Sequence, residues 1–239
     1  MCQFKSGIAV RINESEVSVK VLKLNDSHTD IHDKYYIRNC NHGLSRFSTP
    51  VELVPTKLDF EDQSCWTLVF DDCKPDWWTE CMTDQCISQL LKAAKDDFAA
   101  LKKGRKYCSN SLSMDRLTSI PEGFNPNVRF NLYLNGLTRV PEDFKPTVGG
   151  DLHMPSLTSV PESFNPKVGG CLILTGVSQL PKLFHPRVKK FISCASIVYL
   201  PFDGGLIPFA RPIHLSFFDR LFRACMYRMS KLNRKVGVK

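Results

Sequence analysis

The sequence predicts an α+β protein: a small mixed domain in residues 1–105, a solenoid of short parallel strands in residues 106–203, and a C-terminal helix. Three observations carry this expectation. Residues 117–196 repeat with a constant period of twenty, two apolar stretches near the start flank a polar turn, and residues 76–101 have helical spacing. Hydrophobic residues make up 43% of the 239 residues, which is ordinary for a globular protein.

The repeat is regular along its whole length. The copies read LTSIPEGFNPNVRFNLYLNG, LTRVPEDFKPTVGGDLHMPS, LTSVPESFNPKVGGCLILTG and VSQLPKLFHPRVKKFISCAS, and a partial fifth begins at Ile197. A fixed period means that each copy is one supersecondary unit that buries its apolar side against its neighbours. Such arrays more often present a surface to a partner than perform chemistry.

Within each copy, a Leu-x-Leu alternation predicts a short strand with one buried face, as at Leu132 and Leu134. A phenylalanine recurs every twenty residues and predicts a stacked aromatic spine. A first proline in each copy ends the strand, and a second holds the outer turn. The glycine pairs at 149–150 and 169–170 permit a tight bend back to the next strand.

The order LxL followed by LTxLP at a period of twenty resembles the short leucine-rich repeats of bacterial effector proteins. The resemblance covers residues 114–203 and implies a right-handed solenoid with a parallel sheet on its concave side. The chain departs from that pattern where FNPxVGG replaces the usual second leucine and proline run. The ubiquitin-ligase activity of that family belongs to a separate domain, and nothing in this chain matches it.

In the first domain, Phe4–Arg11 and Glu16–Leu24 predict a hairpin that turns at Asn13–Glu14. Residues 51–54 and 66–70 predict two further strands. Between Asp76 and Leu101 the apolar residues follow i, i+3, i+4, i+7 spacing, which predicts a helix capped by Asp76 or Thr79.

The same domain resembles an uncharacterised domain common in phage and prophage proteins. The features are CxFxSGI from Cys2, DSHTDI from Asp26, FSTPVELVP from Phe47 and PDWWTE from Pro75. The resemblance implies that Cys2, Ser6, Asp26, Ser27 and His28 are signature positions. It also implies a phage accessory protein in the bacterial cytoplasm.

Cys2 is the sharpest enzymatic candidate. If Met1 is removed, Cys2 becomes an N-terminal nucleophile whose free amine serves as general base, and Asp26, Ser27 and His28 are groups that assist such chemistry. Burial of an inert thiol is the competing interpretation. A zinc site at His28, His32, Cys40 and His42 matches no established ligand spacing, so neither a metal nor a cofactor is predicted.

Most of the positive charge lies at the C-terminus. Residues 211–239 hold 8 Lys+Arg and 1 Asp+Glu, against a net charge of +8 for the chain. Residues 204–239 predict a linker and an amphipathic helix that caps the solenoid, with an apolar face from Leu215 to Leu232. Its basic side also suits an anionic membrane or nucleic acid phosphates. That side consists of Arg220, Arg223, Arg228, Lys231, Arg234 and Lys235.

The favoured function is binding of a protein partner, a host or phage protein, through the concave strand face. The outward positions that alternate with buried leucines are Asn131, Tyr133, Asp151, His153, Ile173 and Ser193. Two alternatives stay open: a Cys2-dependent hydrolase or transferase with the repeats as targeting arm, and nucleic-acid or membrane attachment through the tail. The absence of a signal-peptide pattern and of a long apolar run favours a cytoplasmic protein without a transmembrane segment.

Overall fold

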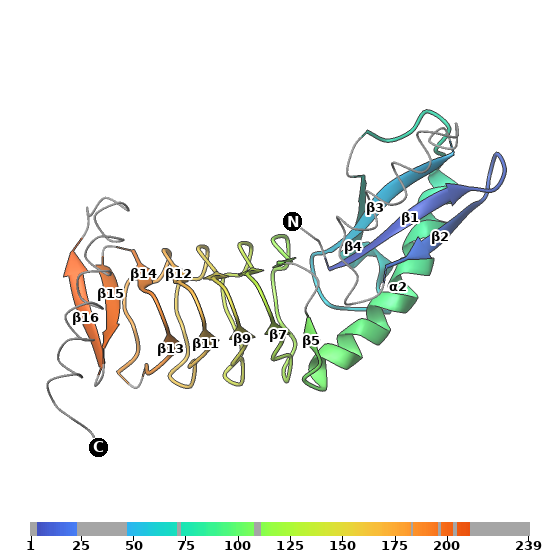
Figure 1. The fold of residues 1–239 in the computed structure, drawn as a ribbon. Helices are drawn as coiled ribbons and strands as arrows, with labels where there is room; N and C mark the ends of the chain where they lie inside the picture. Colours follow the sequence, from blue (N-terminus) through green and yellow to red (C-terminus); the bar gives the residue numbers. More distant parts are fainter. Residues whose placement is uncertain are drawn as a thin grey trace, which may run out of the picture.

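The computed structural model describes residues 4–22, 47–70, 73–107, 111–182, 184–195, 197–202 and 205–210. Figure 1 shows an elongated molecule. An antiparallel sheet with one long helix lies at one end, a hairpin lies at the other, and the repeat forms a row of stacked turns between them. The sequence therefore predicted correctly a sheet domain joined to a parallel-strand solenoid.

The first domain contains a four-stranded antiparallel sheet in the order β2-β1-β3-β4. Its strands are β1 (Lys5–Arg11), β2 (Val17–Val21), β3 (Ser48–Pro55) and β4 (Trp66–Phe70), and a short 3-10 helix, η2 (Gln63–Cys65), precedes β4. The predicted β1–β2 hairpin is confirmed. Its turn is closed where the Ile12 amide donates to the Glu16 carbonyl at 2.9 Å, and the Asn13 side chain accepts from the Ser15 amide at 3.0 Å.

Helix α2 (Glu80–Lys102) covers one face of this sheet. Four of the apolar residues that the spacing predicted to face inward are buried: Ile87, Leu90, Ala94 and Leu101. Leu91 and Phe98 are partly buried, and Met82 and Cys86, which the spacing did not include, are buried as well. Thr79 is the N-cap, one of the two residues expected there. The helix ends because Gly104 takes a positive φ of 84° and donates to the Leu101 carbonyl.

Each turn of the solenoid contributes one strand to each of two parallel sheets. In the described residues the first sheet contains β6 (Leu112–Ser113), β8 (Leu132–Tyr133), β10 (Leu152–His153), β12 (Leu172–Leu174) and β14 (Ile192–Cys194). The second contains β5 (Lys106–Tyr107), β7 (Asn127–Val128), β9 (Thr147–Val148), β11 (Lys167–Val168) and β13 (Arg187–Val188). Neighbouring parallel strands are in register at a shift of twenty residues, except that β5 and β7 pair at a shift of 21.

The second sheet lies where the sequence predicted only an outer turn. Val128, Val148 and their equivalents point inward and are buried, so each FNPxVGG segment carries a strand of its own. The strand is only two residues long, too short for an alternation of apolar and polar residues to reveal it. The repeat is therefore a two-sheet β-solenoid of about four turns.

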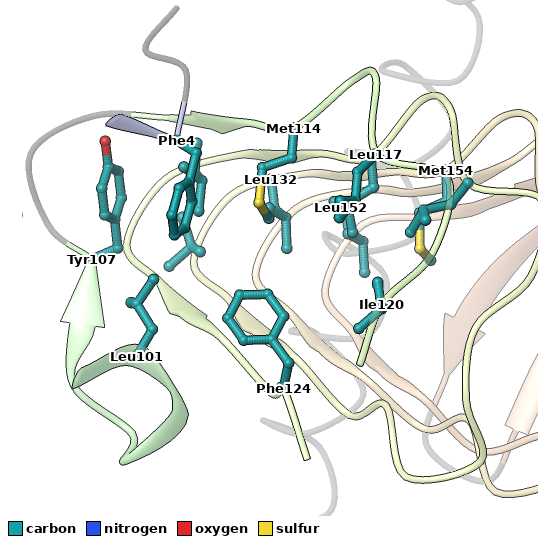
Figure 2. Close-up of a cluster of buried hydrophobic side chains, with 14 of the residues drawn as sticks. Phe4, Leu101, Tyr107, Met114, Leu117, Ile120, Phe124, Leu132, Leu152 and Met154 are labelled. Atoms are coloured by element: carbon teal, nitrogen blue, oxygen red, sulfur yellow. The ribbon is translucent and has the colours of Figure 1, made fainter. Parts of the chain in front are cut away.

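The phenylalanine spine is confirmed. Phe164 stacks between Phe144 and Phe184, with ring centroids 6.2 Å apart on each side. Phe124, one period before Phe144, stacks on Phe98 of α2 at 5.0 Å and so connects the first turn to the first domain. Figure 2 shows Phe4 and Leu101 of that domain among the interior side chains of the first turns. The two parts therefore share one continuous core.

The far end of the first sheet is closed by a hairpin. Strand β15 (Ile197–Phe202) pairs antiparallel with β14, and β16 (Gly205–Ala210) pairs antiparallel with β15. The partial fifth copy at Ile197 thus reverses direction instead of adding a sixth parallel strand to the sheet. The predicted C-terminal capping helix lies outside the described residues.

Candidate binding face

The candidate site is the outward row of the first sheet, which we call the binding face: Ser113, Tyr133, His153, Ile173 and Ser193. Each lies next to an inward, fully buried residue of the same strand, such as Leu132 beside Tyr133. In-register pairing places Tyr133 beside His153 and His153 beside Ile173. The outward direction of these positions is the one that strand alternation predicted.

The centre of the binding face is aromatic and apolar. The Tyr133 and His153 rings stack with centroids 4.7 Å apart and planes 27° apart. Together with Ile173, these side chains are partly exposed. Ser193, which was predicted to be available to a partner, is only 5% exposed, and Ser113 at the other end of the row is buried.

Asn131 and Asp151 were predicted to contact a partner, but their side chains bond to the backbone of the next turn. The side-chain oxygen of Asn131 accepts the Asp151 amide at 2.8 Å, and Oδ1 of Asp151 accepts the Cys171 amide at 2.7 Å. These bonds satisfy backbone donors where one turn stacks on the next. Asn131 Nδ2 also donates to the Tyr133 hydroxyl at 3.1 Å, which orients the phenol.

Asp115, on the other border of the binding face, was not among the residues predicted from the sequence. Its carboxylate accepts from the Ser113 hydroxyl at 2.7 Å and from the Asn135 amide at 3.2 Å. The signal was present in the repeat, because Asp115 stands one period before Asn135. Its role as an acceptor could be recognised only once residues 112–116, which precede the first full copy, were known to belong to the stack.

Burial and the carboxylates of Asp151 and Asp115 change the pKa of His153 in opposite directions. Burial lowers the pKa of His153 below its ordinary value of 6.5, while Asp151 and Asp115 oppose that shift by favouring the protonated ring. Burial has the larger effect, so the ring is neutral near pH 7. It can then donate or accept one hydrogen bond while stacking on Tyr133.

The enzymatic candidates Cys2, Asp26, Ser27 and His28 lie outside the described residues, as do the zinc candidates at 28–42. Within the described ranges, no group of three or more His, Cys, Asp or Glu side chains is arranged to hold a metal ion. The basic tail residues Arg220, Arg223, Arg228, Lys231, Arg234 and Lys235 also lie outside those ranges.

The described signature position, Ser6, is buried in β1. Its hydroxyl donates to Glu52 of β3 at 3.2 Å. Next to it, the buried Lys5 ammonium bonds to Asp97 of α2 and to the Leu22 carbonyl. These contacts tie β1 to β3 and to the helix, which assigns the two side chains to the stability of the domain.

Helices in the described parts of the chain are neither long nor apolar enough to cross a membrane. No protein-family model, curated protein or solved structure was found to match this chain.

Proposed function

We propose that the chain is a protein-binding module and that the binding face of the first sheet makes the contact. The supporting observation is the continuous row Tyr133, His153 and Ile173, held in register on rigid parallel strands and partly exposed to solvent. Aromatic side chains at the centre of a patch are typical of residues that carry most of the energy of an interface.

The borders of the face define the partner's chemistry. Asp115 and Asp151 lie on either side of the row, and the outward residues of the row itself carry no Lys or Arg. A complementary surface has an aliphatic or aromatic anchor for the centre and basic or amide donors for the edges. The backbone of the face is fixed by the ladder of side-chain acceptors, so little conformational entropy is lost on binding.

The biological setting is part of the same proposal. The resemblance of the first domain to a phage and prophage domain supports a phage-encoded accessory protein that meets a host or phage protein in the bacterial cytoplasm. The LTxLP repeats support kinship with short leucine-rich repeats, whose strand faces serve for binding. On this proposal the first domain closes one end of the array and presents the binding face.

The test is affinity purification of the tagged full chain from its native host cell. The double variant Tyr133→Ala with His153→Ala should lose the partners that the unmodified chain retains. The matched control, Ser159→Ala with Gln179→Ala, changes two exposed positions on another side of the solenoid and should retain them. Equal recovery by both variants, with unchanged folding by circular dichroism, would overturn the proposal.

A further inference from the structure

The second sheet carries a different chemistry from the binding face. Its inward residues are Tyr107, Val128, Val148, Val168 and Val188, all buried. The residues on either side of them point outward, and none of those in the described chain is acidic. The charged ones are all basic and exposed: Lys106, Arg129, Lys167, Arg187 and Lys189. We call this set the basic face.

Two cations of the basic face, Lys167 and Arg187, lie side by side with no salt-bridge partner among the described residues. Lys167 pairs in register with Arg187, so their backbones are about 4.8 Å apart. Like charges directly opposite one another on a sheet are destabilising. Neither side chain forms a salt bridge with a residue that the structure describes. Such an arrangement is relieved when an anion binds across the two strands.

The floor of the basic face is bare backbone. Arg129 and Lys189 occupy the same position of the repeat three turns apart, and Gly149 and Gly169 stand between them. The resulting strip without side chains is about 14 Å long, three strand spacings. The glycines are required by packing, since a Cβ at Gly169 would lie 2.1 Å from the Gly149 carbonyl oxygen. An extended chain can therefore lie flat on the strip between cations.

One end of the strip holds an exposed aromatic ring. Phe130 is 43% exposed, and the Arg129 guanidinium lies over its ring at 5.3 Å from the centroid. A cationic track beside an exposed aromatic side chain is the combination that binds single-stranded nucleic acid, in which phosphates meet the cations and a base stacks on the ring. An acidic peptide would use the cations but has no need of the ring.

We propose that the basic face binds single-stranded nucleic acid, independently of the protein partner assigned to the binding face. The phosphates lie along Lys167, Arg187 and Lys189, and one base stacks on Phe130. No base edge is read, so the binding is electrostatic and tolerant of sequence.

The test is fluorescence anisotropy of a labelled 20-mer oligothymidylate titrated with the full chain between 50 and 200 mM salt. The variant Lys167→Gln, Arg187→Gln and Lys189→Gln should bind at least about ten-fold more weakly. Its plot of log affinity against log salt should be shallower by about 2, because each lost phosphate contact on a single strand removes ~0.7 from the slope. Phe130→Ala should weaken binding by about five-fold or more at unchanged slope, the effect of losing one stacked base.

The matched control removes three exposed cations elsewhere, Lys57→Gln, Lys74→Gln and Lys92→Gln. It should retain the affinity and slope of the unmodified chain. A control that loses as much as the basic-face variant would overturn the proposal, as would an unmodified chain that does not bind. Tighter binding of an oligoglutamate peptide, or of duplex DNA, than of the oligothymidylate would also overturn it. Circular dichroism melting of each variant separates loss of binding from loss of the fold.

Discussion

The side-chain oxygen of Asn131 accepts the backbone N–H of Asp151, the residue one full turn further along the chain. Asp151 repeats the arrangement with Cys171, so two polar side chains at the same position of the repeat hold successive turns together. These positions look like surface residues in the sequence. Their role as acceptors arises only when the turns stack in register.

The first prediction follows from this ladder. Asp151→Ala leaves the partly buried Cys171 amide without an acceptor and should lower the free energy of unfolding by about 1–3 kcal/mol. Asp151→Asn keeps an oxygen in the same place and should cost clearly less. Urea denaturation followed by circular dichroism measures both. Equal losses in the two variants would show that the acceptor contributes nothing.

The second prediction concerns close stacking at the glycine pairs. A Cβ at Gly169 would lie 2.1 Å from a backbone oxygen that cannot move without shifting the preceding turn. Gly169→Ala should therefore lower the free energy of unfolding by about 3 kcal/mol, the upper end for overpacking. Gly104→Ala is the comparison, because that Cβ meets nothing within 4 Å and its left-handed backbone alone costs roughly 1–2 kcal/mol. Chemical denaturation of the two variants would contradict this account if Gly104→Ala were the more damaging.

The third prediction concerns pH. Because burial holds the pKa of His153 below 6.5 in the folded chain, the unfolded chain takes up a proton first as the pH falls. The free energy of unfolding should therefore decrease as the pH drops below about 6.5, and level off once the folded ring is protonated. His153→Gln should remove this part of the pH dependence.

NMR titration of the His153 ring protons measures the pKa of His153 in the folded chain directly. The midpoint should lie below that of a histidine in an unfolded peptide. A midpoint above 6.5 would mean that Asp151 and Asp115 outweigh burial, and the pH dependence of stability would then have the opposite sign.

The fourth prediction concerns thiol reactivity. Burial raises the pKa of the Cys171 thiol to about 11 and that of Cys86 to about 12, so neither is a thiolate near neutral pH. Iodoacetamide should modify both at least about ten-fold more slowly than the exposed Cys73 at pH 8, since only the thiolate attacks. Peptide mapping by mass spectrometry gives the three rates. Equal labelling of Cys171 and Cys73 would show that the stack opens readily at that turn.

Much of the fold could be predicted because it depends on local patterns. The helix spacing from Ile87 to Leu101 located α2, and the twenty-residue period located the first sheet and the phenylalanine spine. The second sheet could not be found, because a single inward valine per turn, such as Val148, gives no alternation to detect. The reversal at Ile197 was hidden because IVYLP repeats the LTxxP segment of the earlier copies, which forms no strand there but forms β15 here.

The sequence predicted which way the side chains of the candidate site point better than it predicted what each side chain does. Strand alternation placed Tyr133, His153 and Ile173 outward correctly. It did not distinguish them from Asn131 and Asp151, whose side chains bond to the next turn. Alternation placed Ser193 outward, but the residue is buried. Alternation gives only the direction of a side chain and does not say whether another segment of the protein covers it. The basic face was missed since its cations are scattered over Lys106, ahead of the first copy, and three copies of the repeat, and share one face only in the folded stack.

Every turn contributes to both faces at once, since one twenty-residue copy supplies a strand to each sheet. Gaining or losing a copy would lengthen or shorten both surfaces by the same step of about 4.8 Å. Point substitutions can change the two faces separately, but changes in repeat number cannot. The lengths of the binding face and of the basic face are therefore inherited together.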